Sequence, residues 1–158
     1  MIIHSLQEFY QLCQVGQPII SVDHGNIKMG LAISSPDHYL ALPLQIIAAD
    51  SDKKIILQLV QVIKQKNACA LVIGLPINMD GTKSEQTIKV ENFANQIQKQ
   101  INLPIFLQDE RLTSKAADNF LKNFGMKRKQ RNAIDDLTSA SMILETTLNS
   151  INKFAKPQ

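Results

Sequence analysis

The first third of the chain alternates between short hydrophobic runs and turn-forming residues. The runs are residues 18–22, 29–34 and 39–47, and the segments between them contain the turn formers of 24–26 and 35–37. Short apolar runs separated in this way are typical of strands in an antiparallel meander, so we predict three strands here. Pro43 lies inside the third run and cannot donate a backbone hydrogen bond. We therefore expect that strand at an edge of the sheet.

After the meander, helical and strand patterns follow one another. The pattern predicts a helix at 55–63, a strand at 69–74, a helix at 90–101, a strand at 104–108, a helix between Ser114 and Gly125, and a last helix beginning around 135–136. The run 69–74 is continuously apolar, as in a central strand buried on both faces. Thr82 and Glu85 have the spacing of a capping box before the helix at 90–101. A mixed sheet with helices packed on it is predicted, which is the α/β class.

Residues 2–13 also have helical spacing and precede the main pattern. We therefore divide the chain into an N-terminal helical extension at 1–16, a single domain at 17–150 and a C-terminal tail at 151–158. A chain of 158 residues is long enough for one domain that buries about two thirds of its unfolded surface.

Composition narrows the class of protein only moderately. The net charge of +3 permits nucleic-acid binding without requiring it. The two cysteines, Cys13 and Cys69, form no CxxC motif, so neither a disulfide framework nor a zinc site is expected, and a reducing cytoplasm is the expected compartment. The N-terminus has no signal-peptide pattern, and no apolar run reaches the roughly 18 residues that a membrane span needs.

Acidic residues stand at the ends of three predicted elements. Asp23 ends the first meander strand, Asp109 or Glu110 ends the last strand, and Asp135 or Asp136 opens the last helix. Taken singly, each is explained as well by a turn, a solvated loop charge or a helix cap. Strand ends on one edge of an open α/β sheet converge, however, and ligands bind there. Oxygen ligands alone favour Mg²⁺ or Mn²⁺, and we expect two such ions.

A carboxylate cluster of this kind suits phosphodiester hydrolysis, in which paired metal ions activate a water and stabilise the leaving oxygen. Lys28, between two glycines, is a candidate phosphate contact, and Arg111 is a candidate partner for a carboxylate or a phosphate. A predicted basic loop adds candidate contacts to a nucleic-acid backbone at Lys127, Arg128, Lys129 and Arg131. Solvated surface charges would give the same pattern. His24 should point away from Asp23 if the strand persists, so no metal role is expected for it.

Four segments together carry a more specific pattern. In chain order they are VDHGNIKMGLAIS, VIGLPINMDG, DERLTS and IDDLTSASMIL. They resemble the YqgF/RuvX family of bacterial pre-16S rRNA nucleases, which is similar to Holliday-junction resolvases and has a ribonuclease-H-like fold. The resemblance spans about Ile19 to Leu148 and departs from the family pattern at Asn26, where Thr or Ser is usual.

The resemblance implies a fold, a site and a reaction. The fold would be a ribonuclease-H-like mixed sheet, with the antiparallel meander joined to parallel strands and flanked by helices. Asp23, Glu110 and Asp136 would be the catalytic metal ligands, with Asp135 as second choice for the third, and the GLPINMDG loop would border them. The reaction implied is metal-dependent hydrolysis of structured RNA, at the 5′ end of pre-16S rRNA during ribosome biogenesis.

Other functions share parts of this pattern. A Holliday-junction resolvase acting on four-way DNA needs the same three acids, and it acts as a dimer, for which the sequence shows no clear surface. A regulatory factor that binds nucleic acid without cutting it would retain the acids without turnover. A sugar kinase or actin-like ATPase also begins with a D-x-G hairpin, but it needs a second lobe that this chain is too short to supply.

Overall fold

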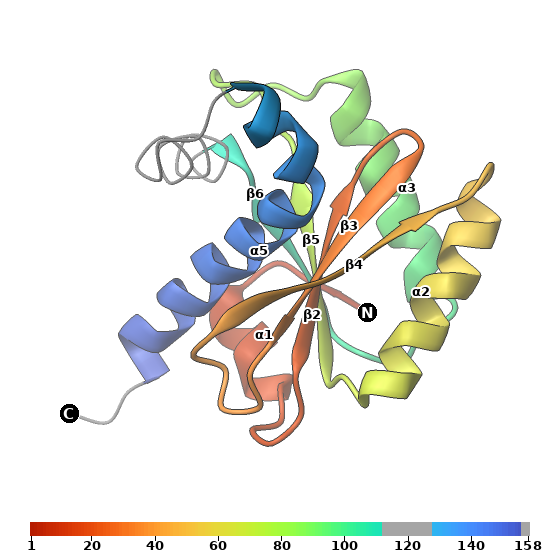
Figure 1. Ribbon diagram of the computed structural model, residues 1–158. Helices are drawn as coiled ribbons and strands as arrows, with labels where there is room; N and C mark the ends of the chain where they lie inside the picture. The colour runs from red at the N-terminus through yellow and green to blue at the C-terminus, as the bar shows by residue number, and fades with distance from the viewer. Residues whose placement is uncertain (112–127, 156–158) are drawn as a thin grey trace.

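The computed structural model describes residues 1–111 and 128–155, with side chains for 1–111 and 138–154. These residues form a six-stranded mixed sheet in the order β1-β6-β5-β2-β3-β4, with helices on both faces (Figure 1). The strands are β1 (Ile2–Ile3), β2 (Ile19–His24), β3 (Lys28–Ser34), β4 (Ala41–Ala48), β5 (Ala70–Leu75) and β6 (Ile105–Asp109). The helices described are α1 (Leu6–Leu12), α2 (Asp52–Lys66), α3 (Glu85–Gln98) and α5 (Arg128–Ala155).

The predicted meander and the predicted central strand are both confirmed. Strands β2, β3 and β4 pair antiparallel in sequence order, and β4, which contains Pro43, is an edge strand. Strand β5 lies between β6 and β2 and pairs parallel with both. Its residues Ala70 to Gly74 are all buried, as expected of a strand covered on both faces.

Two apolar layers hold the helices on the sheet. Ile20 and Val22 of β2 face one layer, which includes the buried sides of α2 and α3. Ile19 faces the other, which includes Phe9 of α1 and the buried side of α5. Because successive side chains of a strand alternate between faces, a single hydrophobic strand supplies both layers. The Ser21 hydroxyl also faces α5 and donates a hydrogen bond of 2.8 Å to the Ala140 carbonyl.

Three local predictions are wrong at element ends. Residues Ile2–Ile3 form strand β1, paired parallel with β6, because a two-residue strand is too short to show a period. The capping box of α3 is made by Ser84 and Thr87 and does not involve Thr82, whose hydroxyl bonds Asp80. Helix α5 begins at Arg128, so the predicted basic loop is helical there, as suits its Arg, Lys and Gln residues.

The last helix also runs further than expected at its C-terminal end. Residues 151–155, predicted as tail, continue α5, and Ile151 is fully buried against the sheet. The helix predicted between Ser114 and Gly125 lies outside the described residues. Within the described part of the chain, no helix combines the length and the apolar character that crossing a membrane requires.

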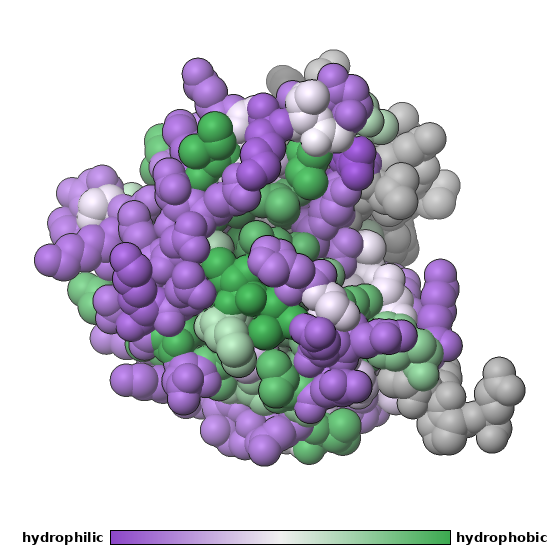
Figure 2. All heavy atoms as spheres, turned by 180° about the vertical axis from the view of Figure 1, so that it is seen from behind, coloured by the Kyte–Doolittle hydropathy of each residue, from purple (hydrophilic) through white to green (hydrophobic). Residues whose placement is uncertain are grey.

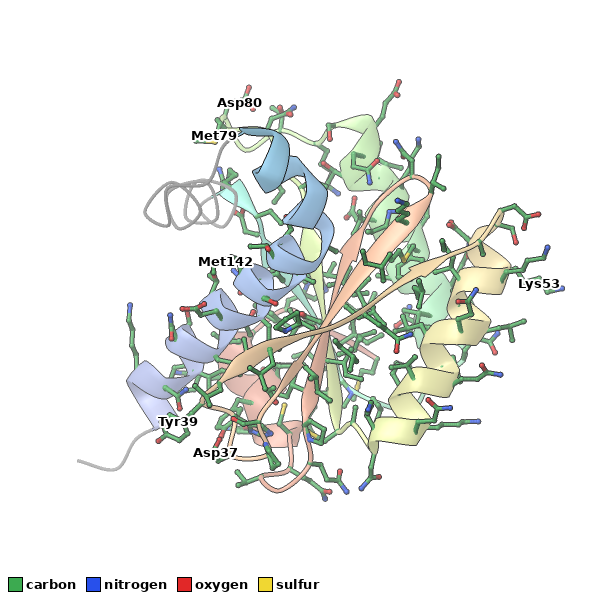
Figure 3. All side chains as sticks on the ribbon, viewed as in Figure 1. Asp37, Tyr39, Lys53, Met79, Asp80 and Met142 are labelled. Carbon is green, nitrogen blue, oxygen red and sulfur yellow. The ribbon has the colours of Figure 1, made fainter. Side chains whose placement is uncertain are left out.

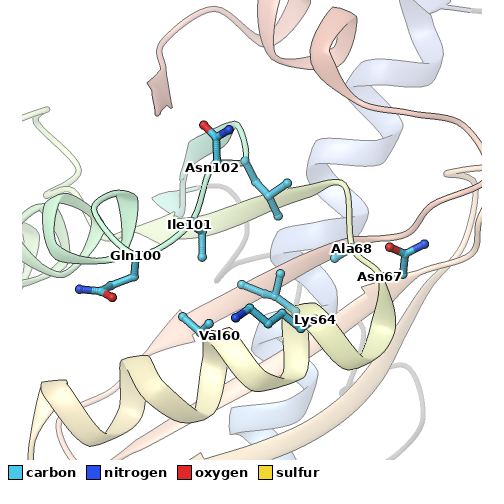
Figure 4. A pocket seen from close by; sticks show the side chains of 9 residues that line it. Val60, Lys64, Asn67, Ala68, Gln100, Ile101 and Asn102 are labelled. Atoms are coloured by element: carbon cyan, nitrogen blue, oxygen red, sulfur yellow. The ribbon is translucent and has the colours of Figure 1, made fainter.

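A hollow of about 330 Å³ lies between the end of α2 and the turn after α3 (Figure 4). Its lining mixes apolar and polar side chains, among them Val60, Lys64, Gln100 and Ile101. Seen from behind, hydrophobic side chains gather near the centre of the molecule and hydrophilic ones surround them (Figure 2). The hollow lies at the end of the sheet where β5 and β6 begin, opposite to the ends that carry the predicted acids.

Candidate active site

Asp23 is the penultimate residue of β2, and its neighbours on both sides are glycines. It pairs with Gly30 of β3, and the pairing of Val22 with Ile73 places Gly74 of β5 on its other side. Neither neighbour has a side chain, so the space beside the Asp23 carboxylate is left for other groups. Strand pairing alone therefore presents this carboxylate at the carboxyl end of the central strands, where ligands bind in open α/β sheets.

Glu110 reaches the same place from the end of β6. Its backbone N–H donates to the Leu75 carbonyl at 3.1 Å, and its side chain lies over Gly74. A Cβ atom at Gly74 would be 2.8 Å from Glu110 Oε1 and 2.5 Å from Ile143 Cδ1 of α5. Both distances are too short for real contacts, so a larger residue at this position would displace the Glu110 carboxylate or the Ile143 side chain from where they lie.

Asp23 and Glu110 form a close pair, called here the acidic pair. Burial, the charge of Asp23 and a hydrogen bond between the two carboxyls together raise the pKa of Glu110 to about 8, and burial is the largest of these causes. Near neutral pH the pair therefore holds a proton that an isolated glutamate would have lost. A cation bound at the pair would displace this proton and remove the repulsion.

The third predicted acid, Asp136, is placed only by the backbone of α5. Ala140, one helical turn further along, accepts the hydrogen bond from Ser21, two residues before Asp23. Helix α5 begins at the end of the sheet that carries the acidic pair (Figure 1). The side chains of Asp135 and Asp136 lie outside the described part, as do those of Arg128, Lys129 and Arg131; Lys127 lies outside it altogether. Among the side chains that are described, no group of three His, Cys, Asp or Glu is arranged to hold a metal ion.

The two other cationic candidates have different surroundings. Lys28 is the first residue of β3, and its side chain is exposed beside the hairpin that follows Asp23. Gly25 is required in that hairpin because a Cβ there would collide with the Lys28 carbonyl. Arg111 instead pairs with Asp109: its Nη2 lies 2.7 Å and its Nε 2.9 Å from Asp109 Oδ2. This bidentate bond lowers the pKa of Asp109.

The loop between β5 and α3 follows Gly74 and is fixed by its own hydrogen bonds. The Thr82 N–H and hydroxyl both donate to Asp80 Oδ1, at 3.0 and 2.6 Å, and the Thr87 hydroxyl donates to the Pro76 carbonyl. Asp80 and Met79 lie at the same end of the molecule as the start of α5 (Figure 3). The Arg111 side chain approaches the loop at Gly81, where a Cβ would be 3.7 Å from its Nη1.

His24 packs on the other face of the sheet, as predicted. Its ring centroid lies 4.8 Å from that of Phe93 in α3, and Gln86 donates to its backbone carbonyl at 3.2 Å. The close approach of Glu110 to Gly74, the bond from Ser21 to α5 and the pairing of Asp109 with Arg111 were not predicted, although Asp109 was a candidate acid. Gly74 ends a continuous apolar run, so its position at the end of a buried strand could have been predicted. The contacts of Ser21 and Asp109 could not, because they depend on how α5 and Arg111 pack.

The mixed sheet, with its antiparallel meander, its parallel strands and its helices, has the ribonuclease-H-like fold. The same fold is seen in Thermus thermophilus RuvC, solved in complex with a Holliday junction substrate: the TM-score is 0.59 at 15% identity, covering 90% of this chain and 99% of that one. At this identity the likeness concerns the fold alone.

The chain belongs to the RuvX family. The family model, described as Holliday junction resolvase, matches residues 17–150. A Rickettsia bellii protein (strain OSU 85-389) named "Putative pre-16S rRNA nuclease" is 58% identical over 97% of this chain and 99% of its own length. A Rickettsia felis protein with the same name is 52% identical over the same shares. The family resemblance seen in the four sequence segments is thus confirmed.

Proposed function

We propose that this chain is a metal-dependent nuclease that hydrolyses phosphodiester bonds in structured RNA, at the 5′ end of pre-16S rRNA during ribosome biogenesis. The observation that carries the proposal is the acidic pair. Its two carboxylates are far apart in the sequence but lie together, partly buried, beside Gly74. The names of the two Rickettsia relatives support precursor rRNA as the substrate.

The donor atoms of the acidic pair fit Mg²⁺ or Mn²⁺. Both donors are carboxylates, the ligands that these hard cations prefer, and the raised pKa of Glu110 is the cost of holding the pair without a cation. We propose Asp23, Glu110 and Asp136 as the ligands of two ions. When bound, such ions would supply an activated water and stabilise the leaving oxygen.

The residues around the pair would position the RNA backbone. Lys28, exposed at the start of β3, is proposed to contact a phosphate from the hairpin side. Arg111 keeps Nη1 toward the loop at Gly81 while its other nitrogens hold Asp109, and we propose a phosphate contact there. Further phosphate contacts are proposed for Lys127, Arg128, Lys129 and Arg131, which precede Asp136 in the chain.

We also propose how the chain is divided and where it acts. Residues 17–150 would be the nuclease domain, with an extension at 1–16 that packs on it through β1 and Phe9, and a tail at 151–158 whose residues 151–155 continue α5. The family match over 17–150 supports these limits. Cytoplasmic action is proposed because precursor rRNA is the proposed substrate and because both cysteines are free thiols.

A second candidate function is resolution of four-way DNA junctions, which the description of the family model favours. The two candidates use the same acids, so the substrate distinguishes them. With Mg²⁺, we expect the protein to cut a precursor 16S rRNA 5′ segment at least tenfold faster than a four-way DNA junction. The reverse preference would show that the protein is a junction resolvase. Binding of RNA without cleavage of either substrate would show that it is a non-catalytic RNA-binding factor.

A further inference from the structure

Gln86, in the first turn of α3, holds the end of β2 at the residue that follows Asp23. Its Nε2 donates to the His24 backbone carbonyl at 3.2 Å and lies 3.3 Å from Nδ1 of the His24 ring. A carbonyl can only accept a hydrogen bond, so the amide nitrogen of Gln86 must face it, and Nδ1 accepts from the same group. One side chain of α3 therefore holds both the backbone and the ring of His24.

This contact lies where the sheet stops supporting β2 from one side. The parallel pairing of β2 with β5 ends at Val22, one residue before Asp23. The antiparallel pairing with β3 continues through Asp23 to His24. Among the described residues, the last two positions of β2 therefore pair with a strand on one side only. Gln86 supplies a hydrogen bond to β2 at the point where its pairing with β5 has ended.

The first turn of α3 is itself fixed by hydrogen bonds on both sides of Gln86. Ser84 and Thr87 form a reciprocal capping box, in which each side chain accepts a hydrogen bond from the backbone of the other. The Thr87 hydroxyl also donates to the Pro76 carbonyl, which ties this turn to the segment that leaves β5. Gln86 therefore extends from a fixed turn, and its hydrogen bond fixes the end of β2 relative to α3.

His24 is kept in this place although one of its ring nitrogens lacks a hydrogen bond. Its side chain is 5% exposed and packs on Phe93. Because Nδ1 accepts from Gln86, the ring proton is on Nε2, which is buried and has no hydrogen-bond partner among the described residues. The Asp52 carboxylate lies 3.9 Å from Nε2, too far for a hydrogen bond. A buried donor without a partner costs free energy, so the contacts with Gln86 and Phe93 hold the ring against that cost.

We propose that Gln86 is a positioning residue of the candidate active site: by fixing His24, it keeps the neighbouring Asp23 carboxylate in the geometry that cleavage requires. The inference rests on the proposed nuclease function. Gln86 would contact neither the metal ions nor the RNA, so its loss should slow the chemical step and leave substrate binding unchanged. A displacement of about 1 Å at a reacting centre can lower the rate by about a hundredfold.

Steady-state kinetics of Gln86→Met and Gln86→Glu test this role. Methionine has a similar length and no donor, and glutamate keeps the shape but presents only acceptors to the His24 carbonyl. For Mg²⁺-dependent cleavage of the precursor rRNA segment, kcat should fall about tenfold to a hundredfold in both variants, with KM changed less than about twofold. Gln96→Met is the matched control. Gln96 is exposed on the same helix, so this variant should keep the wild-type kcat.

Hydrogen exchange of the backbone amides measures the same effect without cleavage. In Gln86→Met, the amides of residues 23–30 should exchange at least about threefold faster than in the wild type, a larger increase than any in β5. The Gln96→Met control should exchange as the wild type does in both segments.

The possible outcomes separate this inference from the proposed function. A wild-type kcat in either folded Gln86 variant, a higher KM with unchanged kcat, or unchanged exchange in the hairpin would overturn the role of Gln86 and leave the nuclease assignment intact. Failure of the wild type itself to cleave RNA would refute the proposed function, and with it the reaction that Gln86 is proposed to serve.

Discussion

Replacement of Asp23 by asparagine is expected to reduce Mg²⁺-dependent cleavage of the precursor rRNA segment by about a thousandfold or more. Asparagine keeps the size of the side chain and removes the charge that the proposed metal site requires. The protein should remain folded, because Asp23 lies between two glycines at the end of β2 and contributes no apolar packing. The measurement is the initial rate of cleavage by wild type and variant under identical conditions.

Asp50→Asn is the matched control for this experiment. Asp50 is exposed and pairs only at the surface, with Lys54 at 3.0 Å, so the same chemical change there should leave the rate close to wild type. Circular dichroism and thermal melting should show both variants to be folded. A folded Asp23→Asn protein with full activity would remove Asp23 from the site.

Replacement of Glu110 by glutamine is expected to stabilise the metal-free protein at about pH 8 while abolishing cleavage. The folded-state pKa of Glu110, about 8, lies above its ordinary value of 4.5. Between these two values the folded state binds more protons than the unfolded state, so this residue makes stability fall as the pH rises. Glutamine keeps no such proton, so we expect its gain in unfolding free energy over wild type to grow by up to about 1.4 kcal/mol per pH unit across this range.

The difference between variant and wild type isolates Glu110 from all the other titratable groups, which the two proteins share. At about pH 5 the two proteins should have similar unfolding free energies in urea, and the gap should open progressively above that pH. Glu145→Gln, which changes an exposed glutamate of α5, is the control and should show no such trend. A gap that is constant with pH would show that Glu110 is not held protonated by its surroundings.

The antiparallel meander, its edge strand and the burial of the central strand were predictable because they depend on local patterns. The three hydrophobic runs, Pro43 in the third, and the continuous run at 69–74 each correspond to a position in the sheet that only such residues occupy. The convergence of Asp23 and Glu110 followed from the same reasoning, since both end a strand. The resemblance, and not the pattern, selected Glu110 over Asp109.

What could not be predicted depends on contacts between distant segments. Asp109 differs from Glu110 because Arg111 folds back to bind it, and no period in the sequence carries that information. Strand β1 forms because the edge of β6 is free to pair with Ile2 and Ile3. Helix α5 starts at Arg128 because helix-forming residues precede the expected start of the helix at 135–136.

Calorimetric titration of Mn²⁺ into wild-type protein and the Asp23→Asn variant tests most directly whether the acidic pair is a divalent-cation site. For the wild type near neutral pH, we predict binding accompanied by release of a proton to the buffer, because the cation displaces the proton that Glu110 holds. Repeating the titration in buffers of different ionisation enthalpy measures that proton. The variant should lose the binding. Equal binding by both proteins, or no binding by the wild type even with RNA present, would contradict the account.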